Sequence, residues 1–401
     1  MKRLGIALAS VYFFLVCPAV GLAQSAFSGG YIGRFTLQER PVANTDGKTE
    51  QQMRLYNRVL LQYEPSENFA FRTAVRRADF FQEETGNTHL YYTYLNWKPF
   101  SALETTLGRQ YPYNKMVRRA VDGLSAEWEV FEHWTLKGLW GVFAPADRAG
   151  FAESPEDEHG SYVALAYEGS DNASLEASGY QRVTQGRIMN FAGVEGRYPD
   201  LLGISMHAFM KYNFSENLLQ EAEVQLRREF GDNLAITMAG KYRDPNFDLP
   251  PWYWQFTVDP YSTYRVAADY FVTSTGSFNL SYFTRKLSDS VIERIRVGWL
   301  EPSWTIGVVH AAESGAGTEE WNIYGSIQHR FGKHLLAGAG ANYFDYVFQE
   351  QYEDPLNAFG AQGFVKYRIW NSLTLGVRGY YLTNPEFSED LRMIGELSYR
   401  F

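Results

Sequence analysis

Apolar and polar side chains alternate with a period of two along nearly the whole chain, in segments of about ten residues. In the last segment, residues 391–401, odd-numbered positions from Leu391 to Phe401 are mostly apolar and even-numbered positions from Arg392 to Arg400 are mostly polar. A period of two is typical of β-strands with one apolar and one polar face. Few windows show apolar residues at helical spacing over several turns, so the sequence predicts an all-β chain.

Short and long connections separate these segments. Tight turns are predicted at residues 65–68, 168–172, 231–233, 273–276, 332–333 and 371–372. Longer polar connections are predicted at residues 41–50, 144–160, 244–260, 346–357 and 384–390. Transmembrane β-barrels have short turns at one end and longer loops at the other. The sequence therefore predicts a closed antiparallel transmembrane β-barrel of about 22 strands, within a range of 18 to 22.

The aromatic content supports a barrel in a membrane. Aromatic residues make up 16% of the chain, with 28 Tyr, 28 Phe and 10 Trp. In hydrocarbon every backbone N–H and C=O needs an internal partner, and a closed sheet supplies it without helices. Tyr and Trp near strand ends then suit the interfaces between lipid and water, whereas the alternative is ordinary packing in a large soluble β-protein. The expected interface residues are Tyr91, Trp97, Trp128, Trp134, Trp299, Trp304, Trp321 and Tyr399.

Residues 1–23 have the features of a cleaved signal peptide. Lys2 and Arg3 precede an apolar stretch, and the segment ends in small residues at Gly21 and Ala23. The apolar stretch is shorter than the ~20 residues that a membrane-spanning helix needs. The remaining chain shows no linker and no break in composition. Residues 24–401 are therefore predicted to form a single outer-membrane β-barrel domain.

Charge, cysteine content and motifs exclude several functions. The formal net charge is −9, and loss of Lys2 and Arg3 makes the mature chain more acidic, which disfavours a nucleic-acid partner. The only cysteine, Cys17, lies in the predicted leader, so no disulfide or cysteine-based zinc site is expected. The seven histidines are scattered, and no nucleophile elbow, zinc-protease motif or phosphate-binding loop is present. We expect no metal, no cofactor and no catalytic residues.

The signal peptide and the final strand together resemble those of Gram-negative outer-membrane β-barrel proteins of the porin-like kind. The final strand ends Leu397-Ser398-Tyr399-Arg400-Phe401, with a terminal aromatic residue. The resemblance is one of class only, so no site residue is transferred from a particular family. It implies a bacterial outer-membrane location, with outer-membrane lipid and the barrel-assembly machinery as partners. It also implies that Tyr399 and Phe401 form the assembly signal.

Basic residues outnumber acidic ones on the face predicted to line the lumen. The densest cluster is Arg54, Arg58, Arg72 and Arg76, on two strands joined by the turn at 65–68. Further basic candidates for the pore lining are Arg294, Arg296 and Arg378. A ring of Arg and Lys favours anions in a pore. The alternative is a ladder of Arg–Glu pairs that braces the wall.

The connection at residues 244–260 is the least regular in the chain. It contains four prolines and the aromatic run Trp252-Tyr253-Trp254. A stiff aromatic loop could fold inward as a constriction or stack on a sugar-like or aromatic ligand. The alternative is that the loop packs over the barrel rim.

Three functions remain compatible with these features. The first is a porin-like channel for passive passage of small hydrophilic solutes, with an anion preference. The second is a barrel sheath or scaffold that houses a partner protein in its lumen, such as a cytochrome or a secreted chain. Only a short segment precedes the first predicted strand, so no internal plug of the kind found in large transporters is expected. The third, an outer-membrane enzyme, would need residues assembled from distant strands.

Overall fold

The computed structural model describes residues 26–41, 49–81, 85–112, 114–144, 158–169, 171–184, 186–245, 259–314, 318–347, 356–384 and 389–401. The predicted leader lies outside these ranges. The described residues form the strands β1 (Phe27–Pro41), β2 (Thr49–Ser66), β3 (Phe69–Phe80), β4 (Thr85–Phe100), β5 (Leu103–Gln110), β6 (Val121–Phe131), β7 (Trp134–Phe143), β8 (Glu158–Glu168), β9 (Ser174–Thr184), β10 (Arg187–Leu201), β11 (Ile204–Asn213), β12 (Leu218–Phe230), β13 (Leu234–Arg243), β14 (Tyr261–Phe271), β15 (Ser277–Lys286), β16 (Val291–Leu300), β17 (Trp304–Glu313), β18 (Thr318–Phe331), β19 (Leu335–Val347), β20 (Leu356–Arg368), β21 (Leu373–Thr383) and β22 (Asp390–Arg400). No helix within the described ranges is long and apolar enough to span a membrane.

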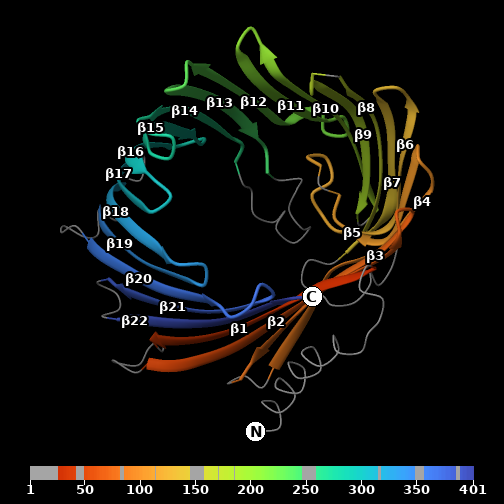
Figure 1. The fold of residues 1–401 in the computed structure, drawn as a ribbon. Coiled ribbons are helices and arrows are strands. Elements are labelled where there is room, and N and C mark those ends of the chain that lie inside the picture. Colours follow the sequence, from red (N-terminus) through yellow and green to blue (C-terminus); the bar gives the residue numbers. More distant parts are fainter. Residues whose placement is uncertain are drawn as a thin grey trace.

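The strands form one closed antiparallel barrel, seen end-on in Figure 1. Each strand pairs with its neighbours in the sequence, and β22 also pairs with β1, from Gly30 opposite Arg400 to Gln38 opposite Arg392. This last pairing leaves no free sheet edge, so the backbone groups of the terminal strands have partners inside the sheet. The predicted antiparallel barrel of about 22 strands is confirmed.

Connections alternate between the two rims of the barrel. We call the rim with the connections after even-numbered strands, together with Phe27 and Phe401, the turn rim, and the opposite one the loop rim. Every predicted tight turn follows an even-numbered strand, as residues 231–233 do between β12 and β13. Every predicted long connection follows an odd-numbered strand, as residues 144–160 do between β7 and β8. The prediction of short turns at one end and longer loops at the other is confirmed.

The outward face of the wall is apolar. In β21 and β22, Val377 and Met393 are 54% and 53% exposed, because the alternation turns them away from the lumen. Aromatic residues collect on this face near the turn rim: the rings of Trp134 and Tyr167 lie 5.1 Å apart. A broad exposed apolar face is costly in water but suits hydrocarbon, and aromatic residues suit its boundary.

Phe401 helps to close the seam between β22 and β1. Its backbone accepts a hydrogen bond from Gly29 N at 2.9 Å and donates one to Gly29 O at 3.1 Å. Its ring stacks on Phe27, with centroids 5.9 Å apart. The seam is where strands from opposite ends of the chain meet, so these contacts form only when the barrel closes.

Deleting Phe401 is expected to lower the yield of folded barrel. The deletion removes both backbone hydrogen bonds and the ring contact at the seam, in addition to the predicted assembly signal. The measurement is the fraction of protein in outer-membrane fractions that migrates as a compact barrel on unheated gels. Phe331→Ala is the matched control, because Phe331 is an exposed aromatic at the end of β18, far from the seam. Equal yields from both variants would contradict a special role for Phe401.

Candidate functional site

Part of the connection between β5 and β6 folds into the lumen (Figure 1, orange segment inside the ring). We call residues 111–120 the inner loop; all of them except residue 113 are described. Met116 and Val117 are its anchors, with 3% and 1% exposure. They join a buried apolar cluster on the inward face that includes Phe191 and Phe209. The inner loop is therefore packed against the wall of β8 to β11.

Gly193 makes this packing possible. A Cβ atom at Gly193 of β10 would lie only 2.4 Å from Met116 Sδ, so a larger residue would force the Met116 side chain out of its place against the wall. Lys211 of β11 adds a hydrogen bond, since its Nζ donates to Met116 O at 3.4 Å. The backbone of the inner loop is also fixed internally, because the Tyr111 hydroxyl donates to Arg118 O at 2.6 Å.

Three basic residues of the inner loop pair with acidic residues of the wall. Arg118 Nη2 lies 2.5 Å from Glu221 Oε2, and Lys115 Nζ lies 3.2 Å from Glu223 Oε2. Arg119 pairs with Glu158 of β8. The Glu221 side chain is 1% exposed and is also paired with Lys241, at 2.8 Å. Such a buried carboxylate is stable as a charge only with its cations in place.

The inward face can be followed from strand to strand through the register. Glu221 of β12 lies opposite Lys211, and Lys211 lies opposite Gly193. The same face continues through β9 to β4 and reaches Arg72 of β3, opposite Tyr94. The other predicted arginines of β2 and β3 lie on the same face of the sheet as Arg72, because they alternate in step with it. The structure therefore places them in the lumen.

Three of these residues, Arg54, Arg58 and Arg76, form what we call the arginine cluster. Arg58 and Arg76 are directly opposite each other on β2 and β3. The ring of Tyr91 lies 5.2 Å from the Arg58 guanidinium and 5.7 Å from that of Arg76. Arg54 lies 5.2 Å from the ring of Phe80. Aromatic faces attract guanidinium groups without cancelling their charge.

The charge of the arginine cluster is uncompensated by ion pairs within the described ranges. No carboxylate of those ranges forms an ion pair with any of the three residues, and the buried Nε of Arg76 has no hydrogen-bond partner there. Arg72, predicted as a fourth member, differs: its Nη2 lies 2.6 Å from Glu64 Oε1. The cluster therefore presents three guanidiniums that form no ion pair with a described carboxylate, with Arg72 in a separate ion pair nearer the turn rim.

Tyr91 was expected at the lipid interface, and this expectation is wrong. The register shifts by one residue between Ala74 and Val75, so that Tyr91 has no partner on β3. A bulge of this kind reverses the alternation locally. The Tyr91 ring consequently lies beside Arg58 and Arg76 in the lumen instead of facing outward.

The other predicted pore-lining arginines lie elsewhere on the inward face. The Arg296 guanidinium lies 5.3 Å from the Tyr324 ring, and its Nε donates to the Tyr324 hydroxyl at 2.8 Å. Arg378 lies 5.5 Å from the ring of Phe364. Arg294 is exposed and lies opposite Phe283. None of these three arginines has a carboxylate partner among the described residues.

The lumen wall therefore has two electrostatic characters. From β4 to β12, basic and acidic residues pair across strands, as Lys137 Nζ and Glu176 Oε2 do at 3.0 Å. From β14 to β22 and on to β3, several arginines contact aromatic rings, beside the ion pairs of Arg34 with Glu396 at 2.8 Å and of Arg72 with Glu64. Both alternatives from the sequence, the ladder of ion pairs and the basic lining, are therefore present in one wall.

The inner loop was not predicted from the sequence. The predicted constriction, Trp252, Tyr253 and Trp254, lies outside the described residues. The available signal was the basic group of Lys115, Arg118 and Arg119 in one connection, but its acidic partners are far away in sequence. Among the described residues, no group of three or more His, Cys, Asp and Glu side chains is arranged to hold a metal ion.

Comparisons with known proteins give structural matches only. No protein-family model and no curated protein matches this sequence. The P pilus usher (PapC) translocation pore is similar in structure, with a TM-score of 0.54 and 9% identity over 94% of this chain and 99% of that chain. OccAB1 of Acinetobacter baumannii has a TM-score of 0.44 and 11% identity, covering 95% and 98%. A BenF-like porin from Pseudomonas fluorescens Pf-5 has a TM-score of 0.43 and 8% identity, covering 95% and 100%. The chain thus has the closed-barrel fold of outer-membrane pores.

Proposed function

We propose that this protein is an outer-membrane channel for passive passage of small hydrophilic solutes, with a preference for anions. The observation that carries the proposal is the arginine cluster, which holds three guanidiniums on the inward face without carboxylate partners in the described ranges. Arginine stays protonated at any accessible pH, so the positive charge is permanent. In a water-filled lumen this charge attracts anions and repels cations over about one Debye length, near 8 Å at physiological salt.

The two faces of the wall support a membrane channel. The outward face is apolar with aromatic residues near the turn rim, which suits lipid, while the inward face is polar and charged. This division suits the bacterial outer membrane. We propose outer-membrane lipid and the barrel-assembly machinery as the partners of the barrel. We keep residues 24–401 as one barrel domain in this proposal.

The inner loop favours a channel over a sheath for a partner protein. Met116 and Val117 are almost fully buried inside the lumen, so the inner loop fills space that a large partner would need. A loop that narrows a wide barrel from one wall leaves a path for small solutes along the opposite wall. The arginine cluster lies on β2 and β3, next to the β4–β5 pair that leads into the inner loop.

A purified, partner-free preparation in planar bilayers tests the channel directly. We expect steady, ohmic conductance steps without any added protein. A sheath would instead be recovered with a stoichiometric partner and conduct only after that partner is removed. Compact migration on unheated gels should establish that the sample is folded. Folded protein that gives no current would overturn the channel proposal.

A further inference from the structure

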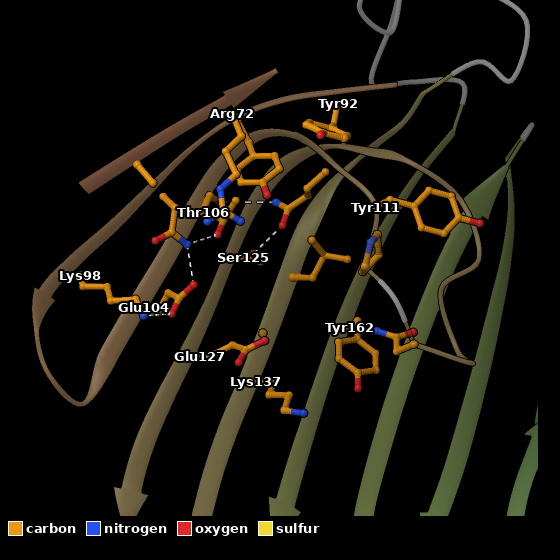
Figure 2. Close-up of a pocket in the computed structure, with 18 of the residues that line it drawn as sticks. Arg72, Tyr92, Lys98, Glu104, Thr106, Tyr111, Ser125, Glu127, Lys137 and Tyr162 are labelled. Carbon is orange, nitrogen blue, oxygen red and sulfur yellow. Dashed lines mark hydrogen bonds and ion pairs between the residues drawn. The ribbon is translucent and has the colours of Figure 1, made fainter. Parts of the chain in front are cut away.

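A polar cavity of about 740 Å³ lies between the inner loop and the turn rim, against β2 to β9 (Figure 2). Tyr111 and Asn114 of the inner loop line one side, and Ser66 lies at the turn rim. Figure 2 shows the side chains of the neighbouring strands pointing into this space, with Tyr111 at its border. Its volume is typical of sites for small molecules.

The charges of the cavity are largely paired. Three ion pairs line it: Arg72 Nη2 with Glu64 Oε1 at 2.6 Å, Lys98 Nζ with Glu104 Oε2 at 2.7 Å, and Lys137 Nζ with Glu176 Oε2 at 3.0 Å. Two further carboxylates, Glu67 and Glu127, also line it. The cavity therefore has no excess positive charge, in contrast to the arginine cluster, and an anion would meet two carboxylates that form no ion pair with a described residue.

Directional hydrogen-bonding groups fill the space between these pairs. Asn96 Nδ2 donates to Glu104 Oε1 at 2.6 Å and to Thr106 Oγ1 at 3.1 Å. The rings of Tyr92 and Tyr94 lie 5.6 Å apart and line the same cavity. Each paired carboxylate keeps lone pairs that are free to accept further hydrogen bonds. The cavity thus combines fixed donors and acceptors with flat apolar ring faces.

We propose that this cavity binds a neutral, polyhydroxylated solute of the mono- or disaccharide class, an inference that rests on the proposed channel because the cavity opens into its lumen. A hydroxyl group both donates and accepts, so it can bond to the carboxylates, ammonium groups and amides without adding charge. The C–H faces of a sugar ring pack against tyrosine rings. Five carboxylates line the cavity beside three basic side chains, Arg72, Lys98 and Lys137, so a cation is the competing ligand that lysine represents in the test.

Two measurements on the full-length barrel test this site. Titration calorimetry of detergent-solubilised protein with maltose, gluconate and lysine compares a neutral, an anionic and a cationic probe. Block of the ion current by maltose in planar bilayers reports the same site in the channel. We expect maltose to bind more tightly than gluconate or lysine and to reduce the current.

A pair of matched double variants locates the binding. Asn96→Leu with Thr106→Val removes polar groups of the cavity and is expected to weaken maltose binding about tenfold, since hydrogen-bonding partners are lost or left unsatisfied. Thr305→Val with Ser326→Ala is the control, because these hydroxyls lie 2.7 Å apart on β17 and β18 and do not line the cavity. The control is expected to bind maltose as the unmodified protein does.

The outcomes separate this site from the channel. If the barrel binds maltose but does not conduct, the proposed sugar site is supported and the proposed channel function is contradicted. If the barrel conducts normally but does not bind maltose, the proposed sugar site is contradicted and the proposed channel function is supported. Tighter binding of gluconate or of lysine would overturn the proposed ligand class. Equal loss in both double variants would contradict the location.

Discussion

Replacing Arg118 and Arg119 by glutamate is expected to release the inner loop and to raise single-channel conductance at least about twofold, because a loop that narrows the lumen sets its resistance. Both arginines pair with wall glutamates, Arg118 with Glu221 and Arg119 with Glu158. Charge reversal places like charges face to face beside Glu221, whose side chain is 1% exposed. Like charges in such a setting cost several kcal/mol, which exceeds the contribution of a typical buried contact.

A steric variant tests the same movement by an independent route. Gly193→Val adds a side chain where Met116 Sδ already lies 2.4 Å from the Cβ position, so it should also displace the inner loop. Gly179→Val is the matched control, because the nearest atom to its added Cβ, on Val163, is 3.7 Å away. We expect Gly193→Val to raise conductance and Gly179→Val to leave it unchanged. Unchanged conductance in both the charge-reversal and the Gly193 variants would show that the inner loop does not limit the current.

Replacing Arg54, Arg58, Arg72 and Arg76 by glutamine is expected to shift the reversal potential in a salt gradient toward cation preference. Arg58 and Arg76 lie opposite each other, and residues so placed are roughly 5 Å apart at Cβ, so their charges act as one patch. The triple variant that keeps Arg72 should show most of the shift, since Arg72 already pairs with Glu64. The shift should be largest at low ionic strength, where screening is weakest.

An outward-facing arginine provides the control for this change of charge. Arg77 is adjacent to Arg76 in the chain but pairs with Asp79, and its side chain is 61% exposed. Alternation directs Arg77 away from the lumen. Arg77→Gln should therefore leave ion selectivity unchanged. Equal shifts from Arg76→Gln and Arg77→Gln would mean that overall charge, and not the lumen lining, sets the selectivity.

Three features could be predicted from the sequence: the number of strands, the rim that carries the short turns, and the residues that face the lumen. Each depends on the local pattern of apolar, polar and turn residues. A period of two assigns every residue to one face, and closure then decides which face meets lipid. Arg54, Arg58 and Arg76 were placed in the lumen by this rule alone. Tyr91 was misplaced because a bulge reverses the alternation at one residue, and nothing in the local sequence marks where the register shifts.

The inner loop could not be predicted because its contacts are distant in the sequence. Arg118 and Glu221 are 103 residues apart, and Lys211 reaches Met116 across 95 residues. Neither end of such a pair carries a motif that points to the other. The choice of arginines that form ion pairs has the same origin, since it depends on which acidic residues the register brings opposite each basic one.

The reversal potential of the unmodified protein tests the central claim most directly. Purified barrels in a planar bilayer, with a potassium chloride gradient at low ionic strength, should give a potential displaced toward the equilibrium potential of chloride. This is the result expected if unpaired arginines line the conducting path. A potential displaced toward that of potassium, or one at zero, would contradict an anion-preferring channel.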